Sequence, residues 1–274
     1  MRINQRPENR EIYLCAAAKD EDPYIDEWMD YHFKLGFEKI VIFRNDWFYE
    51  NHDPRVEVFM ANGNNIQNHV YGEFLTKWRK KFWWVAFIDL DEFIVLHKHK
   101  NMEEFLLEYD DVQALAINWA LFGSNGHKKV VDGNYNVLTR FTRRGTEEDH
   151  TLMKARGTIK TLVRYTNRTR GMGVHNCFGI THTLKREEIF EKPNTPTIDW
   201  EIAQVNHYWI KSLEEAEKKM NRGRATTTIK RDWKEFFIDR DQYSNSVEDL
   251  SAIRFFYGDT MYNKILEERE ERKE

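Results

Sequence analysis

The segment that most constrains the fold is residues 82–93, FWWVAFIDLDEF, in which seven apolar residues run directly into three acidic ones. A strand that is apolar on both faces is typical of the centre of a parallel sheet covered by helices. Burying a carboxylate is costly unless it is paired or binds a metal. Asp89, Asp91 and Glu92 therefore need partners where the predicted strand ends.

Strands and helices alternate on either side of this segment. Apolar runs predict further strands at residues 12–18, 39–43, 56–60 and 112–119, and apolar periodicity predicts helices at 23–35, 64–81, 102–109, 213–222 and 247–265. We expect Asp22 to cap the first of these helices, Pro23 to begin it and Gly36 to end it. The β-α-β-β-α-β order is typical of α/β folds that bind nucleotides.

Length, charge and cysteine content exclude several classes of protein. The 274 residues have a net charge of −4 and an isoelectric point of about 6.2, unlike the basic footprint of a general nucleic-acid binder. No apolar run approaches the roughly 20 residues that span a bilayer. The N-terminus has no hydrophobic signal region, so we expect a cytoplasmic protein. Cys15 and Cys177 are expected to be reduced thiols, too few for a cysteine metal site.

The acids at 89–92 predict a cation site. Sheets of this kind bind ligands at the carboxyl ends of their strands, and Asp89 and Asp91, two residues apart, point to the same side of an extended chain. Carboxylate oxygens are preferred ligands of hard divalent cations. Asp-x-Asp also occurs at 20/22 and 239/241, but only the central motif follows a buried strand. The alternative is a carboxylate pair that caps a loop or binds arginines.

Basic residues gather in one part of the chain. Between residues 140 and 170 lie nine of them, namely Arg140, Arg143, Arg144, Lys154, Arg156, Lys160, Arg164, Arg168 and Arg170. The segment either faces an anionic ligand or forms a solvated basic surface.

Four segments together resemble the GT-A glycosyltransferases of the family-2-like and family-92-like group. They are residues 13–46, 83–93 (WWVAFIDLDEF), 117–127 (INWALFGSNGH) and 205–225 (VNHYWIKSLEEAEKKMNRGRA), in the group's order and spacing. The resemblance implies a mostly parallel sheet with helices on both faces and a smaller C-terminal helical part. A single domain would then comprise a nucleotide-sugar-binding half (11–120), an acceptor-side half (121–225) and a C-terminal helical extension (226–274).

The resemblance also implies a transferase that uses a UDP-sugar and Mn²⁺ or Mg²⁺. A metal that bridges the two donor phosphates neutralises the charge that grows on the leaving diphosphate. By resemblance, Asp89 would contact the ribose or a metal-bound water, and Asp91 would ligate the metal. A further ligand would be His207, with His175 as its competitor.

Other donor contacts are expected at the ends of the first two strands and after His207. Asp20, Asn45 and Asp46 are placed on the nucleoside side, although relatives often have Lys-Asn-Glu where this chain has Lys19-Asp20-Glu21. Phosphate oxygens could be held by basic residues that follow His207, namely Lys211, Arg222 and Arg224. An exposed basic helix face is the alternative for this last group.

Trp119 and His127 are placed on the acceptor side, where Trp119 could form the floor beneath a sugar ring; core packing is its alternative. An inverting reaction, which we expect, needs a carboxylate that removes the proton of the acceptor hydroxyl. The candidate bases are Asp149 (beside Glu147 and Glu148), Asp199 and Asp241. A retaining reaction would need no such base.

We expect the acceptor to be a hydroxyl of a glycan or glycolipid, met either in solution or by transient docking at a membrane, and no nucleic acid. Two rival functions remain. A phosphohydrolase of the haloacid-dehalogenase type also places Asp-x-Asp after an apolar strand, but on its first strand and with Thr or Val where this chain has Phe93. A non-catalytic sugar- or nucleotide-binding module would use some of the nine tryptophans as platforms.

Overall fold

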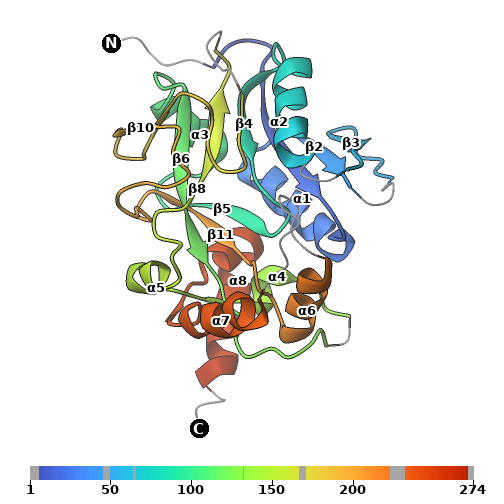
Figure 1. The fold of residues 1–274 in the computed structure, drawn as a ribbon, viewed down its shortest axis with the longest axis vertical. Coiled ribbons are helices and arrows are strands. Elements are labelled where there is room, and N and C mark those ends of the chain that lie inside the picture. Colours follow the sequence, from blue (N-terminus) through green and yellow to red (C-terminus); the bar gives the residue numbers. More distant parts are fainter. Residues whose placement is uncertain are drawn as a thin grey trace.

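The computed structural model describes residues 6–45, 50–63, 66–131, 133–166, 171–222 and 232–270, and it shows a mixed α/β fold built on a curled central sheet (Figure 1). The strand order is β10-β9-β6-β8-β4-β1-β2-β3. The bounds of these strands are β1 (Glu11–Ala18), β2 (Lys39–Arg44), β3 (Val56–Met60), β4 (Phe82–Phe87), β6 (Ala114–Leu121), β8 (Ile159–Arg164), β9 (Ile180–His182) and β10 (Glu188–Phe190). Strands β1 to β4 pair in parallel, whereas β8 lies antiparallel between β4 and β6.

Helices cover both faces of the parallel strands. The helical segments are η1 (Asp22–Tyr24), α1 (Ile25–Leu35), α2 (Ile66–Lys77), α3 (Met102–Glu108), α4 (Val137–Arg140), α5 (Glu147–Leu152), α6 (Leu213–Arg222), η2 (Lys234–Ile238), α7 (Asp239–Tyr243) and α8 (Ser251–Glu270). Alternate residues of β1 face opposite cores: Leu14 packs in the cluster of Trp28 from α1, and Cys15 in that of Phe74 from α2. The predicted two-sided burial of the central strands is thereby confirmed.

A second set of strands returns the chain to the end of β4. Strand β5 (Glu92–Leu96) follows the turn that contains Asp89 and Asp91, and it pairs antiparallel with β11 (Ala203–His207). Strand β11 also runs parallel to β6, which joins the two sets. Neither β5 nor β11 is among the strands predicted from the sequence. Their pairing places His207 directly opposite Glu92.

Most predicted elements are confirmed within a few residues, and Gly36, with φ 108°, ends α1 as expected. The prediction that Asp22 caps α1 is wrong. Residues 22–24 form a 3-10 turn, the N-cap of α1 is Tyr24, and the Asp22 carboxylate pairs instead with the guanidinium of Arg44.

The predicted helix over 247–265 is wrong at its beginning. Val247–Glu248 forms strand β12, antiparallel to β7 (Arg143–Arg144), and α8 begins only at Ser251. The Asp249 carboxylate accepts hydrogen bonds from the backbone and hydroxyl of Ser251, which explains this later start. Gly258 interrupts the helix with φ 82°.

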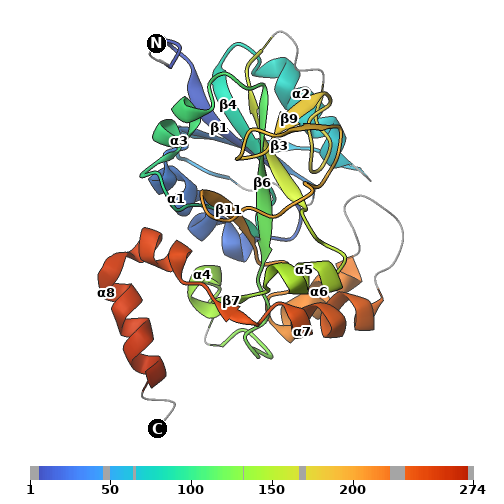
Figure 2. The same ribbon diagram turned by 90° about the vertical axis from the view of Figure 1, so that its left-hand side faces the viewer.

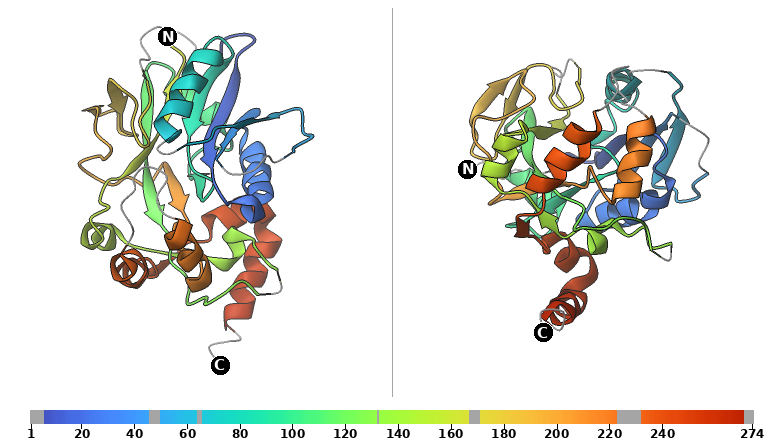
Figure 3. Two further views of the ribbon diagram at one scale, coloured as in Figure 1. Left: turned by 45° about the vertical axis from the view of Figure 1, so that its right-hand side comes forward. Right: turned by 60° about the horizontal axis from the view of Figure 1, so that its bottom comes forward.

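The C-terminal helices differ in how closely they join the sheet. Helices α5, α6 and α7 gather below it (Figures 2 and 3). The first part of α8 packs against the core, with Phe255 against Tyr31 of α1, whereas its C-terminal part projects from the rest of the chain. Within the described ranges, no helix combines the length and apolar character needed to cross a bilayer.

Buried ionic contacts hold α6 in place. The Glu215 carboxylate accepts hydrogen bonds from Arg140 at 2.6 and 3.0 Å, from the Tyr24 hydroxyl at 2.6 Å and from the Ser212 amide at 3.0 Å. Burial raises the pKa of Glu215, but the hydrogen bonds from Arg140, Ser212 and Tyr24 outweigh it and hold this pKa at about 2. The ionised form of Glu215 is therefore part of the folded structure.

We predict that Glu215→Gln destabilises the protein in a pH-dependent way. Near pH 7 the loss should be about 3 kcal/mol, because Arg140 is left buried without its counter-charge. The lowered pKa stabilises the folded wild type fully above about pH 4.5, and this stabilisation disappears as the pH falls towards about 2. Urea unfolding at pH 7, 4.5 and 3 should therefore show the difference between the two proteins shrinking; a constant difference would contradict the assignment.

Candidate functional site

A cavity of about 600 Å³ opens where β1, β2 and β4 end, as expected for the carboxyl edge of such a sheet. One half of its lining comes from these strand ends and the start of α2, including Lys19, Asn45 and Gln67. The other half comes from residues between 119 and 240, including Trp119 and His207. Asp89 and Asp91 line the cavity where the two halves meet the turn after β4.

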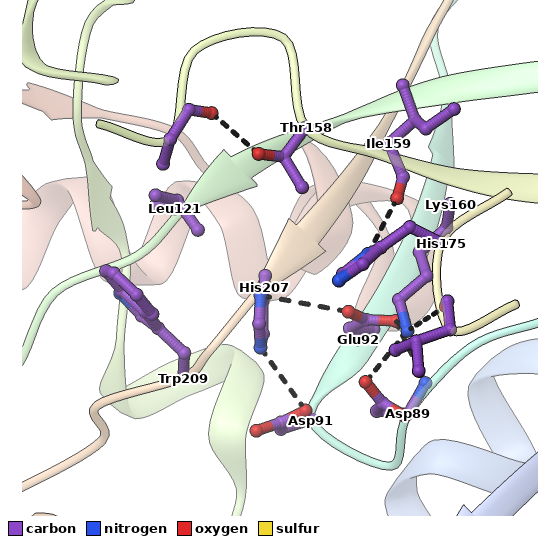
Figure 4. Close-up of polar contacts among 12 residues, drawn as sticks. Asp89, Asp91, Glu92, Leu121, Thr158, Ile159, Lys160, His175, His207 and Trp209 are labelled. Carbon is purple, nitrogen blue, oxygen red and sulfur yellow. Dashed lines mark hydrogen bonds and ion pairs between the residues drawn. The ribbon is translucent and has the colours of Figure 1, made fainter. Parts of the chain in front are cut away.

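Asp89 is held from two sides at the mouth of the cavity. One carboxylate oxygen accepts from Gln67 Nε2 at 2.6 Å. The other accepts from Lys160 Nζ at 2.8 Å (Figure 4). The Lys160 side chain, on β8, is fully buried and also lies 3.3 Å from Glu92 Oε2. The Asp89 side chain keeps 30% of its surface exposed, so it faces a ligand while its two oxygens stay engaged.

Asp91 and His207 lie side by side on the cavity wall. His207 Nε2 lies 3.5 Å from Asp91 Oδ1, and His207 Nδ1 lies 3.7 Å from Glu92 Oε1 (Figure 4). Burial raises the pKa of Asp91, but Lys219, whose Nζ lies 2.5 Å from Oδ2, and His207 lower it well below its usual range. Burial lowers the pKa of His207 more than Asp91 raises it. The pair is therefore an ionised carboxylate beside a neutral imidazole.

Burial has the opposite effect on Glu92. Its carboxyl group is completely buried, and this raises its pKa well above the usual value; Lys160 lowers it, and the charges of Asp89 and Asp91 raise it further. Glu92 Oε2 accepts the backbone N–H of Asp89 at 2.9 Å. Glu92 thus fixes the turn that carries Asp89 and Asp91.

His175, the competitor of His207, lines the cavity at a different place. Its Nδ1 lies 3.1 Å from the carbonyl oxygen of Ile159, and its ring packs edge-on against Trp119 (Figure 4 shows the first contact). Burial and the nearby Lys160 lower the pKa of His175 to about 4. Among the contacts of the described residues, the histidine that faces Asp91 is His207.

The donor set suits a cation that is completed by substrate oxygens. Within the described part of the chain, no three His, Cys, Asp or Glu side chains form a complete metal site. Asp91 and His207 offer two ligands, and Mg²⁺-like ions commonly use one or two carboxylates together with substrate phosphates and waters. The other ring nitrogen of His207, Nδ1, lies 3.7 Å from Glu92 Oε1, which is too far for the hydrogen bond that commonly orients a metal-binding histidine. The two ligands present nevertheless fit such an ion.

The other predicted donor contacts lie in different surroundings. Asn45 lines the cavity and bonds to the backbone of Gly63. Asp20 is exposed, with φ 53°, between the cavity-lining residues Lys19 and Glu21. Lys211 pairs with Glu21 at 3.1 Å. Asp46, Arg224 and the side chain of Arg222 lie outside the described residues.

Of the two acceptor-side candidates, Trp119 lines the cavity and packs against the rings of both His175 and His207. His127 packs edge-on against Phe141 instead, and its carbonyl oxygen accepts from the backbone of Leu213. It is not among the residues that line the cavity.

Each candidate base is engaged in hydrogen bonds or an ion pair with other residues of the chain. Asp149 forms a capping box with Thr146 at the start of α5. Asp199 accepts from the backbone of Glu201 and lies 3.7 Å from Lys185, and Asp241 accepts from the backbone and hydroxyl of Ser124. None of the three lines the cavity.

Three residues that touch the acids are not among the predicted site residues, namely Gln67, Lys160 and Lys219. Lys160 belongs to the basic segment between residues 140 and 170, but its strand, IKTLVR, also contains Thr161 and Arg164, so its sequence does not single out Lys160. Gln67 and Lys219 lie on helices, where a polar residue is ordinary and gives no signal either.

The fold is α/β, and its cavity opens at the carboxyl ends of its strands, where sheets of this kind bind ligands. Residues 75–245, more than half of the chain, match glycosyltransferase family 92. A glycosyltransferase family 92 protein of Ricinus communis is 23% identical over 222 residues, 71% of this chain and 40% of that protein. One of Arabidopsis thaliana is 22% identical over 241 residues, 82% of this chain and 39% of that protein.

The chain belongs to glycosyltransferase family 92. It spans about two fifths of the length of these two relatives.

We predict that Lys160→Met lowers the free energy of unfolding by about 3–5 kcal/mol, because it leaves a buried carboxyl group and Asp89 without their cation. Adding Glu92→Gln in the same chain should restore part of this loss. Urea unfolding followed by circular dichroism measures both. Lys218→Met is the control: it breaks the exposed pair with Glu214, 2.8 Å apart, and should leave the unfolding midpoint nearly unchanged. Equal effects of the two lysine substitutions would contradict the structural role of Lys160.

Proposed function

We propose that this chain is a metal-dependent GT-A glycosyltransferase that moves a sugar from a UDP-sugar to a hydroxyl of a glycan or glycolipid. The observation that carries the proposal is the pair Asp91 and His207, an ionised carboxylate and a neutral imidazole that face each other at 3.5 Å on the cavity wall. Family membership supports the transfer of a sugar. The metal, the UDP donor and the acceptor are the parts that we add.

In this proposal Asp91 and His207 would hold Mn²⁺ or Mg²⁺. When bound, the ion supplies Lewis-acid neutralisation of the leaving group. Asp89, held by Gln67 and Lys160, would accept a hydrogen bond from the ribose through its exposed surface. Asn45, at the end of β2, would contact the nucleoside.

Lys219 would contribute a second positive charge beside the leaving diphosphate. Its Nζ donates hydrogen bonds to the Asp91 carboxylate and, at 2.9 Å, to the carbonyl oxygen of Trp209. The ammonium group therefore already lies beside the carboxylate that would bind the metal. On the acceptor side, Trp119 would pack against the sugar ring. None of Asp149, Asp199 and Asp241 lines the cavity, so we assign none of them as the catalytic base.

The rival functions lose support from the same observations. The Asp-x-Asp motif follows β4, which lies between β1 and β8 in the sheet, and the family is one of glycosyltransferases rather than phosphohydrolases. A non-catalytic module would bind a UDP-sugar without releasing UDP from it. Slow release of UDP in the absence of an acceptor distinguishes the enzyme from such a module.

We predict that UDP binds in the micromolar range when Mn²⁺ is present and at least about tenfold more weakly in chelator, a difference of about 1.4 kcal/mol or more. Asp91→Asn should weaken binding similarly, because it removes the ionised ligand. Calorimetric titration of the full chain measures these affinities. Asp111→Asn, which changes an exposed aspartate that pairs with Arg186, is the matched control and should bind UDP like the wild type. Undiminished binding in chelator would overturn the metal-diphosphate site.

A further inference from the structure

Charge divides the cavity into two unlike halves. The half formed by the ends of β1, β2 and β4 carries both signs, with Lys19 opposed by Glu21, Asp89 and Asp91. The other half, from residue 119 onward, carries Lys154, Arg156, Lys219 and Arg240. Among the described residues that line this second half there is no carboxylate. A ligand in this half therefore meets an excess of positive charge.

The loop that presents Lys154 and Arg156 is firmly fixed. Lys154 has φ 55°, a conformation that costs a non-glycine residue about 1 kcal/mol or more. Backbone hydrogen bonds from Lys154 to Thr151 (3.0 Å) and from Ala155 to His150 (2.8 Å) maintain it. At Gly157, φ is 70° and an added Cβ would lie 2.2 Å from the Thr195 carbonyl oxygen, so the backbones are in close contact. The two cations thus project from a pre-organised loop.

Both side chains of this loop are exposed to a ligand. Lys154 is exposed, and Arg156 pairs with Glu147 at 3.3 Å with about half of each side chain exposed. An exposed pair of this kind contributes little to stability, so an anion can replace Glu147 at small cost. An arginine can also bind a carboxylate or phosphate through two parallel hydrogen bonds.

Arg240 and Trp209 continue the same surface. The Arg240 guanidinium lies 4.2 Å from the centre of the Trp209 ring, which orients it by stacking. Trp209 is only 7% exposed, and its indole N–H has no hydrogen-bond partner among the described residues. An unpaired buried donor beside the cavity is a further group that a polar ligand could satisfy.

These cations lie away from the nucleoside side of the cavity. Helix α2, whose Gln67 holds Asp89, and helix α5, which precedes the loop, are far apart in Figures 1 and 2. Lys219 is engaged with Asp91 and would face the donor diphosphate, whereas Lys154 and Arg156 make no contact with the acids at 89–92 among the described contacts. Their charge is therefore available to a ligand other than the donor.

We infer that the acceptor carries an anionic group, a carboxylate or a phosphate, which Lys154 and Arg156 bind at the rim of the cavity. This inference rests on the proposed function, because it assumes that the half opposite the nucleoside holds the acceptor. It narrows the acceptor to acidic glycans or phosphorylated sugars and lipids. Trp119 would then pack against the sugar ring whose charged group reaches the loop.

Calorimetric titration of the full chain with acidic and neutral saccharides tests the inference, with UDP and Mn²⁺ present and again without them. Trigalacturonate against maltotriose tests the carboxylate, and glucose 6-phosphate against glucose tests the phosphate. We expect one acidic ligand to bind at least about tenfold more tightly than its neutral counterpart, and to lose affinity as salt is added.

The double variant Lys154→Glu, Arg156→Glu should remove this preference, and Lys154→Arg should retain it. Lys100→Glu makes a matched change of charge at an exposed lysine outside the cavity and should bind like the wild type. Thermal unfolding checks that the double variant is folded.

Equal affinity for acidic and neutral saccharides, or a preference that survives in the double variant, would overturn the inference. Failure of the proposed function has a different signature, namely no binding of UDP under any metal condition. The titrations without UDP still compare acidic with neutral saccharides in that case, so the two failures can be told apart.

Discussion

The site depends first on one buried cation. Three acids follow the apolar strand β4, and the fully buried ammonium of Lys160 lies within 3.3 Å of two of them, Asp89 and Glu92. Carboxylates at this depth are tolerated only with such a partner. Lys160 can reach them because β8 inserts antiparallel between β4 and β6. The insertion of β8 is therefore what allows acids to stand at the end of the central strand.

A second constraint is the pairing of β5 with β11, which sets His207 opposite Glu92 and across from Asp91. This pairing joins residues that are more than a hundred positions apart. Strand β11 also pairs with β6, in which Trp119 lies opposite Val205, two residues before His207, and the rings of Trp119 and His207 are in contact. The relative position of the carboxylate, the imidazole and the indole is thus fixed by backbone hydrogen bonds rather than by the side chains themselves. Such fixed geometry is what a site needs if it is to bind a ligand without reorganising.

Sequence patterns predicted the elements and contacts that depend on residues close together in the chain. Apart from β5, the strands and helices up to β6 follow from apolar periodicity, and the turn after β4 follows from its acids. Strands β5, β8 and β11 were not predicted, because they pair with strands that are far away in the sequence. Asp149 shows the converse, because it forms a capping box with Thr146, which lies three residues before it. Asp241 is engaged instead by the backbone and hydroxyl of Ser124, a residue far away in the sequence. Lys160 and Gln67 became visible only once the sheet had brought them beside Asp89.

Lys219 links the two halves of the cavity. Its ammonium group pairs with Asp91 and donates a hydrogen bond to the carbonyl oxygen of Trp209. The Trp209 ring in turn stacks with the guanidinium of Arg240. A metal ion at Asp91 would compete with Lys219 for that carboxylate, because two cations cannot share one carboxylate at full strength. If the proposed donor binds, Lys219 would then turn towards its diphosphate, while α6 stays anchored through Glu215 and Arg140. The same movement would loosen its contact with Trp209, so donor binding and the basic acceptor side would be coupled through a single side chain.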